Sequence, residues 1–201
     1  MPAVTTALLA LAFAATPLYA QTPDPPRAFL LFVDDLHLGF KQTPRTRWVM
    51  QQVLARLTRA GDLLAVTTTG ASSVSLAPTT DVTVVRAAIS RITGNELNAR
   101  EKPSPESSDE SQHRADITSA TAVDAIGGLA ARPNHGEIVV LYITGGDGPG
   151  VTPPARVASA ATDAGVRIVV VAIGELFPDG PDAAILPKDA LEAMFARLAL
   201  P

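Results

Sequence analysis

The residues best suited to chemistry in this sequence follow its most apolar runs. Two adjacent carboxylates, Asp34 and Asp35, come directly after the run Arg27–Val33, and polar or glycine-rich residues follow two other runs, at Thr67–Ser73 and Thr144–Gly150. Buried carboxylates are costly unless something neutralises or solvates them. A hard cation with oxygen ligands would neutralise this pair. Taken alone, the segment favours the other arrangement, a solvated loop in which the carboxylates cap backbone amides.

The apolar runs that precede these polar segments predict a parallel sheet. Near-continuous apolar runs of this length are typical of strands buried on both faces. The alternating segment Ser73–Leu76 suits a short antiparallel edge strand. Because helical patterns separate the runs, we expect a doubly wound, mostly parallel α/β sheet with helices on both faces, and ligands beyond the carboxyl ends of its strands. The expected core strands are Arg27–Val33, Asp62–Thr69, Glu137–Ile143 and Val166–Ile173.

Helical periodicity and capping residues place the helices between the strands. The segment from residue 95 to 114 interrupts this alternation, because it contains two prolines, four serines and several charges, with almost no apolar residues. We expect it to be a polar, flexible loop, since it cannot bury enough surface to offset ordering. The expected helices are Pro44–Ala60, Thr80 or Asp81 to Ile92, Thr121–Ala131, Pro154–Ala164 and Lys188–Leu198.

Composition limits the classes of function. The chain has 201 residues, of which 47% are hydrophobic, and this suits one domain with a full core. A net charge of −4 and the lack of any run of Lys and Arg argue against a nucleic-acid partner. The absence of cysteine excludes disulfides, thiolate metal sites and a cysteine nucleophile.

The first 20 residues are expected to be a signal peptide. Thr5–Ala15 is apolar and uncharged, and it is shorter than the ~20 residues of a membrane span. Cleavage near Ala20, or after Ala14, would leave a proline-containing spacer at residues 21–26 and a domain at 27–201. No Lys or Arg precedes the apolar stretch, so a buried N-terminal helix is the alternative. We expect a periplasmic or secreted protein with no membrane span in its mature chain.

Five segments, in this order and spacing, carry a family resemblance: Phe29–His37, Arg59–Thr69, Thr80–Ile92, Glu137–Gly146 and Ala164–Gly174. Together they resemble a bacterial branch of the von Willebrand factor type A (VWA) family over about residues 27–199. The resemblance implies a doubly wound sheet with one antiparallel edge strand. It also implies a sixth strand after the last helix, and this sequence stops at Pro201 before any such strand. The activity that it implies is cation-dependent binding of a protein partner, without turnover.

The family's metal site uses the pattern Asp-x-Ser-x-Ser after the first strand. Asp34 matches the aspartate of this pattern. The two serine positions hold Leu36 and Leu38, which cannot ligate a metal. The resemblance therefore implies a degenerate site, because Mg²⁺ requires a nearly complete octahedron of oxygen ligands.

The family's other ligands are a threonine at the third helix and an aspartate after the fourth strand. Thr121 is the better match for the threonine and Thr118 the weaker one. The Thr-Asp-Gly of the family becomes Thr144-Gly145-Gly146, although Asp147 lies two residues beyond Gly145. We expect Asp34, Thr121 and Asp147 to be the remaining metal ligands, with no cofactor or only weakly bound Mg²⁺. His37 is expected to be a surface histidine.

Two enzyme-like classes are less well supported. A receiver-type phosphotransfer domain also begins with a strand that ends in paired aspartates, but no aspartate ends a later strand here. A hydrolase would need a nucleophile with its base, and Ser72 and Ser73 lack the Gly-x-Ser-x-Gly elbow. The glycine-rich Thr144–Gly150 lacks the Lys-Ser/Thr of a phosphate loop.

The predicted function is therefore an exported, non-enzymatic domain that binds an unidentified protein partner. Its metal dependence is expected to be weak or lost. The alternative is an accessory domain whose binding face is vestigial. The predicted binding rim comprises Asp34, Asp35, His37, Ser72, Ser73, Thr118, Thr121, Thr144 and Asp147.

Overall fold

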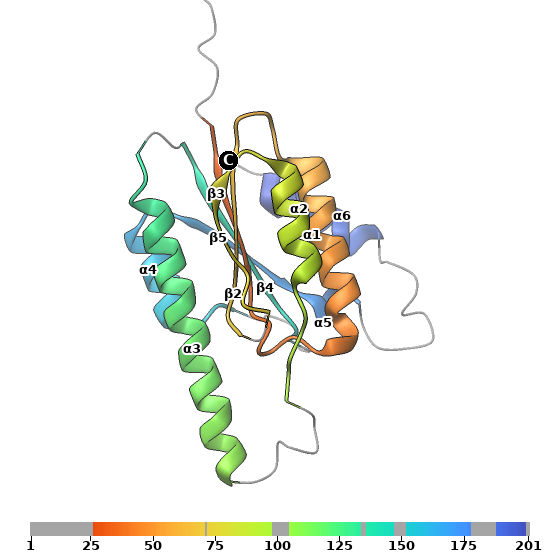
Figure 1. The fold of residues 1–201 in the computed structure, drawn as a ribbon, viewed down its shortest axis with the longest axis vertical. Coiled ribbons are helices and arrows are strands. Elements are labelled where there is room, and N and C mark those ends of the chain that lie inside the picture. The colour runs from red at the N-terminus through yellow and green to blue at the C-terminus, as the bar shows by residue number, and fades with distance from the viewer. Residues whose placement is uncertain are drawn as a thin grey trace, which may run out of the picture.

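The protein folds as an α/β sandwich around a single five-stranded sheet (Figure 1). The structure, a computed structural model, describes residues 26–70, 72–97, 105–133, 136–146, 152–177 and 188–199. The strands lie in the order β3-β2-β1-β4-β5, and all neighbours are parallel except β3, which is antiparallel to β2. The predicted fold class is thereby confirmed. The strands are β1 (Ala28–Val33), β2 (Leu63–Thr68), β3 (Ser75–Thr79), β4 (Ile138–Thr144) and β5 (Arg167–Ala172).

Helices cover both faces of the sheet, as Figure 1 shows. On one face lie α1 (Thr43–Leu57), α2 (Val82–Arg91) and α6 (Lys188–Ala199), and on the other lie α3 (Pro105–Ala130) and α4 (Ala155–Asp163). Two short helices, η1 (Phe40–Gln42) and α5 (Ile173–Leu176), follow the carboxyl ends of β1 and β5. No helix among the described residues has the length and apolarity needed to cross a membrane.

Strand β1 is the centre of the sheet and of both hydrophobic cores. Its side chains alternate between the faces, as they must in an extended strand. Phe29, Leu31 and Val33 join the core under α1, α2 and α6. Ala28, Leu30 and Phe32 join the core under α3 and α4. The run that predicted a strand buried on both faces is therefore buried throughout.

The order in which strands are added to the sheet reverses between β1 and β4, which are parallel neighbours although they lie far apart in the sequence. In register, Val33 pairs with Thr68 of β2 and with Ile143 of β4. The residues that follow Val33 therefore emerge between the ends of β2 and β4. In open α/β sheets this point of reversal forms a crevice in which ligands bind.

The predicted polar loop at residues 95–114 is wrong for its second half, because α3 begins at Pro105. Only the second half of α3 packs on the sheet, where Ala122, Ile126 and Leu129 enter the core. The first half extends past the sheet and is largely exposed, so it carries no apolar stripe (Figure 1). Side-chain pairs spaced four residues apart stabilise this half of the helix instead. One of them is the ion pair between Arg114 and Glu110, in which Nε and Oε1 lie 2.7 Å apart.

Candidate binding site

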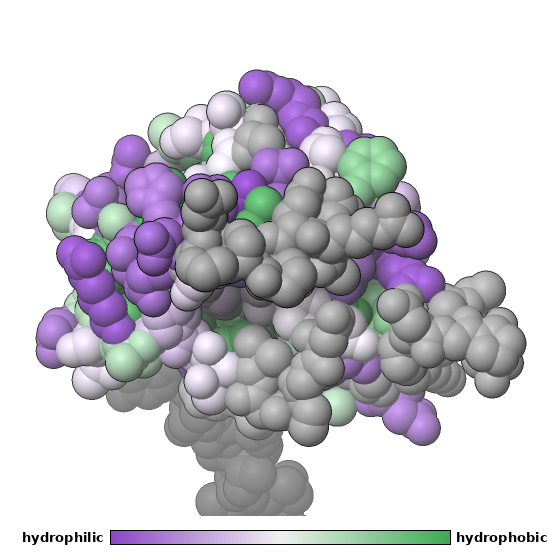
Figure 2. All heavy atoms as spheres, turned by 90° about the horizontal axis from the view of Figure 1, so that it is seen from below, coloured by the Kyte–Doolittle hydropathy of each residue, from purple (hydrophilic) through white to green (hydrophobic). Residues whose placement is uncertain are grey.

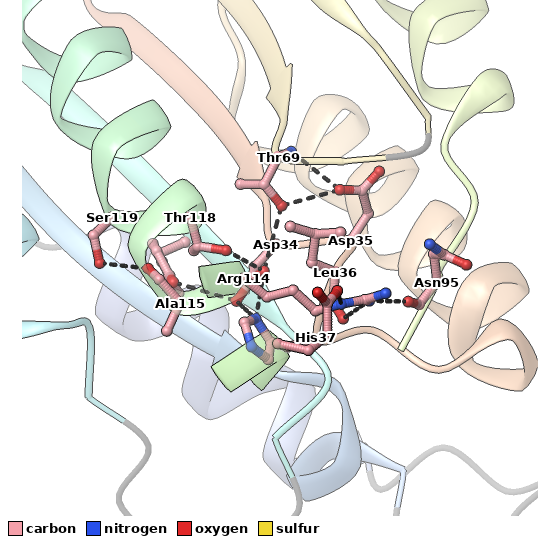
Figure 3. A network of polar contacts seen from close by, with 12 residues as sticks. Asp34, Asp35, Leu36, His37, Thr69, Asn95, Arg114, Ala115, Thr118 and Ser119 are labelled. Carbon is pink, nitrogen blue, oxygen red and sulfur yellow. Dashed lines mark hydrogen bonds and ion pairs between the residues drawn. The ribbon is translucent and has the colours of Figure 1, made fainter. Parts of the chain in front are cut away.

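The carboxyl edge of the sheet is organised around the two aspartates that end β1 (Figure 3). The amide of Asp34 donates to the carbonyl of Ile143 at 2.8 Å and so continues the pairing of β1 with β4 by one residue. Alternation along the strand then directs the Asp34 side chain toward α3, while Asp35 reaches toward the chain after β2. Both residues are buried.

The Asp34 carboxylate is surrounded by hydrogen-bond donors. Thr118, on α3, donates its hydroxyl to Oδ1 at 3.0 Å. The hydroxyl of Thr69 lies 3.4 Å from the same oxygen, and the hydroxyl of Tyr142 lies 3.4 Å from Oδ2. Burial, together with the nearby charge of Asp34 and its hydrogen bond, raises the pKa of the Tyr142 hydroxyl, which keeps this group a donor.

His37 is the closest partner of Asp34. Its Nδ1 atom lies 2.9 Å from Oδ1 and 2.9 Å from Oδ2. A turn brings the imidazole back to the carboxylate, since the amide of His37 donates to the carbonyl of Asp34 at 3.3 Å. The hydrogen bond to Asp34 raises the pKa of His37, although burial partly opposes this effect. The side chain is 37% exposed, so it reaches the surface while bound to Asp34. No residue pattern in the sequence predicts this contact, since His37 is expected to be a surface histidine.

Asp35 anchors the segment after β2. Its Oδ1 accepts the amide and the hydroxyl of Thr69, each at 3.0 Å, and its Oδ2 accepts the amide of Ser72, also at 3.0 Å. This is the amide-capping arrangement that the sequence allowed for the acidic pair, but it is buried rather than solvated. Thr69 lies inside the polar segment Thr67–Ser73, and its position directly after β2 was the available signal.

Neither predicted serine is arranged as a nucleophile. The hydroxyl of Ser72 donates to the carbonyl of Thr93 at 2.9 Å and accepts the amide of Thr93 at 2.7 Å. It therefore joins two loops. Ser73 is exposed in a turn with φ of 46°, and its hydroxyl lies 3.4 Å from the carbonyl of Gly70.

The guanidinium of Arg114, on α3, contacts backbone carbonyls of the loop after β1 and of the segment after α2. It donates to the carbonyl of Asn95 at 2.8 Å and lies 3.4 Å from the carbonyl of Leu36. The amide of Asn95 in turn donates to the carbonyl of Asp35 at 2.7 Å. Arg114 is not among the residues predicted for the site, because the polar composition of residues 95–114 predicts a loop there. The loop after β1 is thus fixed by α3 and by the segment after α2.

The end of β4 approaches the same loop very closely. Gln42 donates to the carbonyl of Gly145 at 3.0 Å and accepts the amide of Gly39 at 2.9 Å. A Cβ atom at Gly145 would overlap the carbonyl oxygen of His37 and lie 2.7 Å from the Gln42 side-chain oxygen. The position that holds an aspartate in the VWA pattern therefore has no room for a side chain.

The described residues do not fit the cation site that the family resemblance implies. Leu38 is part of the hydrophobic core, and Leu36 packs against Gly70. Of the two candidate threonines, Thr118 donates to Asp34, and the hydrogen bonds found among the described residues include none from Thr121, nearly one helical turn further on, to this carboxylate. The described residues contain no group of three or more His, Cys, Asp or Glu side chains that could hold a metal. Asp147 lies outside the described residues, and Thr144 is buried at the end of β4.

An exposed aromatic residue follows the loop that carries this network. Phe40 begins η1, three residues after His37, and its exposed fraction is 74%. Figure 2 shows the molecule from the carboxyl ends of the parallel strands, where the described surface is largely hydrophilic and apolar residues occur singly. In the described part of the chain, the other large hydrophobic residue with high exposure is Val84, at 42%.

Comparison with known proteins adds no assignment: no protein-family model matches the chain, and no curated protein matches it.

Proposed function

We propose that this protein is an exported, non-enzymatic domain that binds a protein partner through the carboxyl edge of its sheet, around Phe40 and His37. The observation that carries the proposal is the exposure of Phe40 at this edge. A phenylalanine exposed to 74% leaves a large apolar area in water, and burial of an aromatic side chain is a frequent source of binding energy at protein interfaces.

The hydrogen bonding of the polar residues supports binding over catalysis. A hydrolytic site needs a nucleophile with a base in reach, together with donors aimed at a reacting atom. Here the donors around Asp34 and Asp35 are directed at the two carboxylates, and the Ser72 hydroxyl is directed at Thr93. These interactions fix the shape of the loop after β1, and this loop leads directly into η1 and presents Phe40.

The test is affinity capture from the native cell envelope with three baits: the wild type, Phe40→Ala and Val84→Ala. Val84 is the matched control, because it is an exposed hydrophobic residue at the other end of the sheet. Its helix, α2, begins just after Thr79, and Thr79 pairs with Leu64 at the start of β2. We expect the wild type and Val84→Ala to recover the same partner, and Phe40→Ala to weaken binding by about 2 kcal/mol or more, as for an interface hot spot.

Two outcomes would contradict this proposal. If Phe40→Ala recovers as much of the partner as the wild type does, the carboxyl edge of the sheet is not part of the interface. That result would favour an accessory domain with a vestigial binding face. Turnover of a substrate that is lost on Ser72→Ala or Ser73→Ala would instead indicate an enzyme. Capture in the presence of a chelator is expected to recover the same partner as capture without it.

Export is tested separately by cell fractionation and by the intact mass of the purified protein. We expect a mature chain that begins near Gln21, because the apolar stretch Thr5–Ala15 precedes the candidate cleavage site at Ala20. A charged residue within that stretch, as in Leu9→Arg, is expected to retain the full-length chain in the cytoplasm. A cytoplasmic wild-type protein with an intact N-terminus would rule out this localisation.

A further inference from the structure

The contact between His37 and Asp34 has the geometry of a bound cation. The Nδ1 atom is equally distant, at 2.9 Å, from both carboxylate oxygens, so it occupies the region between them. A divalent cation that binds a carboxylate through both oxygens occupies the same region. The ring nitrogen and such a cation therefore cannot occupy it together.

The surrounding chain holds the imidazole in this position. The turn from Asp34 to His37 is closed by a backbone hydrogen bond, and Arg114 and Asn95 fix the residues between them. On the other side, Gly145 packs so closely on the carbonyl of His37 that no larger residue fits there. A rotation of His37 away from Asp34 would leave a buried carboxylate without its shortest contact, which is costly.

We propose that the imidazole of His37 takes the place of a divalent cation at Asp34, so that the protein completes this network itself and excludes metal from it. The inference goes beyond the proposed function, because it concerns the protein without its partner. It also accounts for the leucines at positions 36 and 38 and the glycine at 145. Once His37 satisfies Asp34, no further oxygen ligand is needed at those positions.

The experiment measures Mn²⁺ and Mg²⁺ binding to the full chain by electron paramagnetic resonance and by thermal unfolding. The variants are His37→Ala, His37→Lys, and His37→Ala combined with Asp34→Asn. His113→Ala is the matched control, since His113 is an exposed histidine on α3. Circular dichroism of each variant verifies folding before binding is measured.

We expect no saturable Mn²⁺ binding to the wild type, His113→Ala or His37→Lys, because each keeps a donor beside Asp34. We expect His37→Ala to gain saturable Mn²⁺ binding and a rise in midpoint temperature with Mg²⁺. Adding Asp34→Asn should abolish both gains. Partner capture plays no part in these measurements, so their result is independent of the proposed function.

Three results would overturn the inference. Binding of Mn²⁺ to the wild type that is lost on His37→Ala would make His37 a metal ligand instead of a replacement for the metal. Absence of binding to folded His37→Ala would show that His37 does not keep the cation out. If His37→Ala fails to fold, a Mg²⁺-dependent stabilisation of the wild type or of His37→Lys would overturn it equally.

Discussion

Adjacent carboxylates at the end of β1 have partners of different kinds. Asp34 accepts hydrogen bonds from the side chains of His37, Thr118 and Tyr142. Asp35 accepts two backbone amides as well as the hydroxyl of Thr69. A side-chain donor can turn away when its acceptor is lost, but a buried backbone amide cannot. The two residues should therefore contribute differently to stability and to binding.

Replacing Asp35 by Ala is expected to lower the free energy of unfolding by about 2–4 kcal/mol, because the buried amide of Thr69 and that of Ser72 lose their acceptor. Asp35→Asn should also lower the free energy of unfolding, since the side-chain NH₂ group of Asn would face one of these backbone N–H donors. Asp81→Asn is a useful comparison, because that carboxylate caps α2 in an exposed position and Asn caps equally well. Urea denaturation monitored by circular dichroism measures all three. A loss below 1 kcal/mol for Asp35→Ala, relative to the typical ~1 kcal/mol for a single hydrogen bond, would contradict the anchoring role.

A second prediction at the residue scale concerns acid stability. Burial alone would raise the pKa of Asp62, but hydrogen bonds from Arg27 and from the amide of Arg59 bring it below the ordinary value of 3.8. In the unfolded chain the carboxyl protonates at its ordinary pKa, and in the folded chain it remains ionised to lower pH. The stabilisation is therefore complete above pH 3.8 and is lost as pH falls through the folded-state pKa. Asp62→Asn should flatten this part of the stability profile, measured by urea denaturation at several acidic pH values. An unchanged profile would show that another carboxyl dominates.

At the scale of elements, the site depends on close approach of loops that follow different strands. A Cβ atom at Gly145 or Gly94 would overlap backbone oxygens, those of His37 and Leu38 respectively. At Gly70 it would instead meet the end of the flexible Leu36 side chain. We expect Gly145→Ala and Gly94→Ala to cost about 1–3 kcal/mol of stability, and Gly70→Ala to cost less, because a side chain moves more easily than backbone. Thermal unfolding of the three variants checks this order. A larger loss at Gly70 than at Gly145 would contradict it.

The same scale shows how far the sequence could predict the structure. All four core strands were predicted to within two residues, because burial on both faces leaves a continuous apolar run. The beginning of α3 was not predicted, since its overhanging half packs on nothing and has no apolar periodicity. The sequence pattern favours Thr121 over Thr118, because the choice between them depends on the rotation of α3, which tertiary packing sets. The contact of His37 with Asp34 depends on a turn that no residue pattern specified.

At the scale of the whole molecule, one sheet separates two hydrophobic cores, and β1 contributes to both. Leu31 belongs to the core under α1, where Trp48 packs, and Leu30 belongs to the core under α3 and α4. Both leucines are almost fully buried. A substitution that destabilises either core should therefore destabilise the other, because both cores contain side chains of β1. The described layers should unfold together.

The only tryptophan makes this prediction testable, because its fluorescence reports one face of the sheet. Trp48 packs edge to face against Phe177 on the side opposite to Leu30. We expect Leu30→Ala and Leu31→Ala each to lower the free energy of unfolding by about 2–5 kcal/mol, as for other large-to-small core substitutions. In Leu30→Ala, the denaturation midpoint from Trp48 fluorescence should fall as far as the midpoint from far-ultraviolet circular dichroism. A fluorescence midpoint that stays at its wild-type value while circular dichroism shifts would mean that the two faces unfold separately. In that case helices α3 and α4 could detach and release Thr118 from Asp34 while the Trp48 core stays folded.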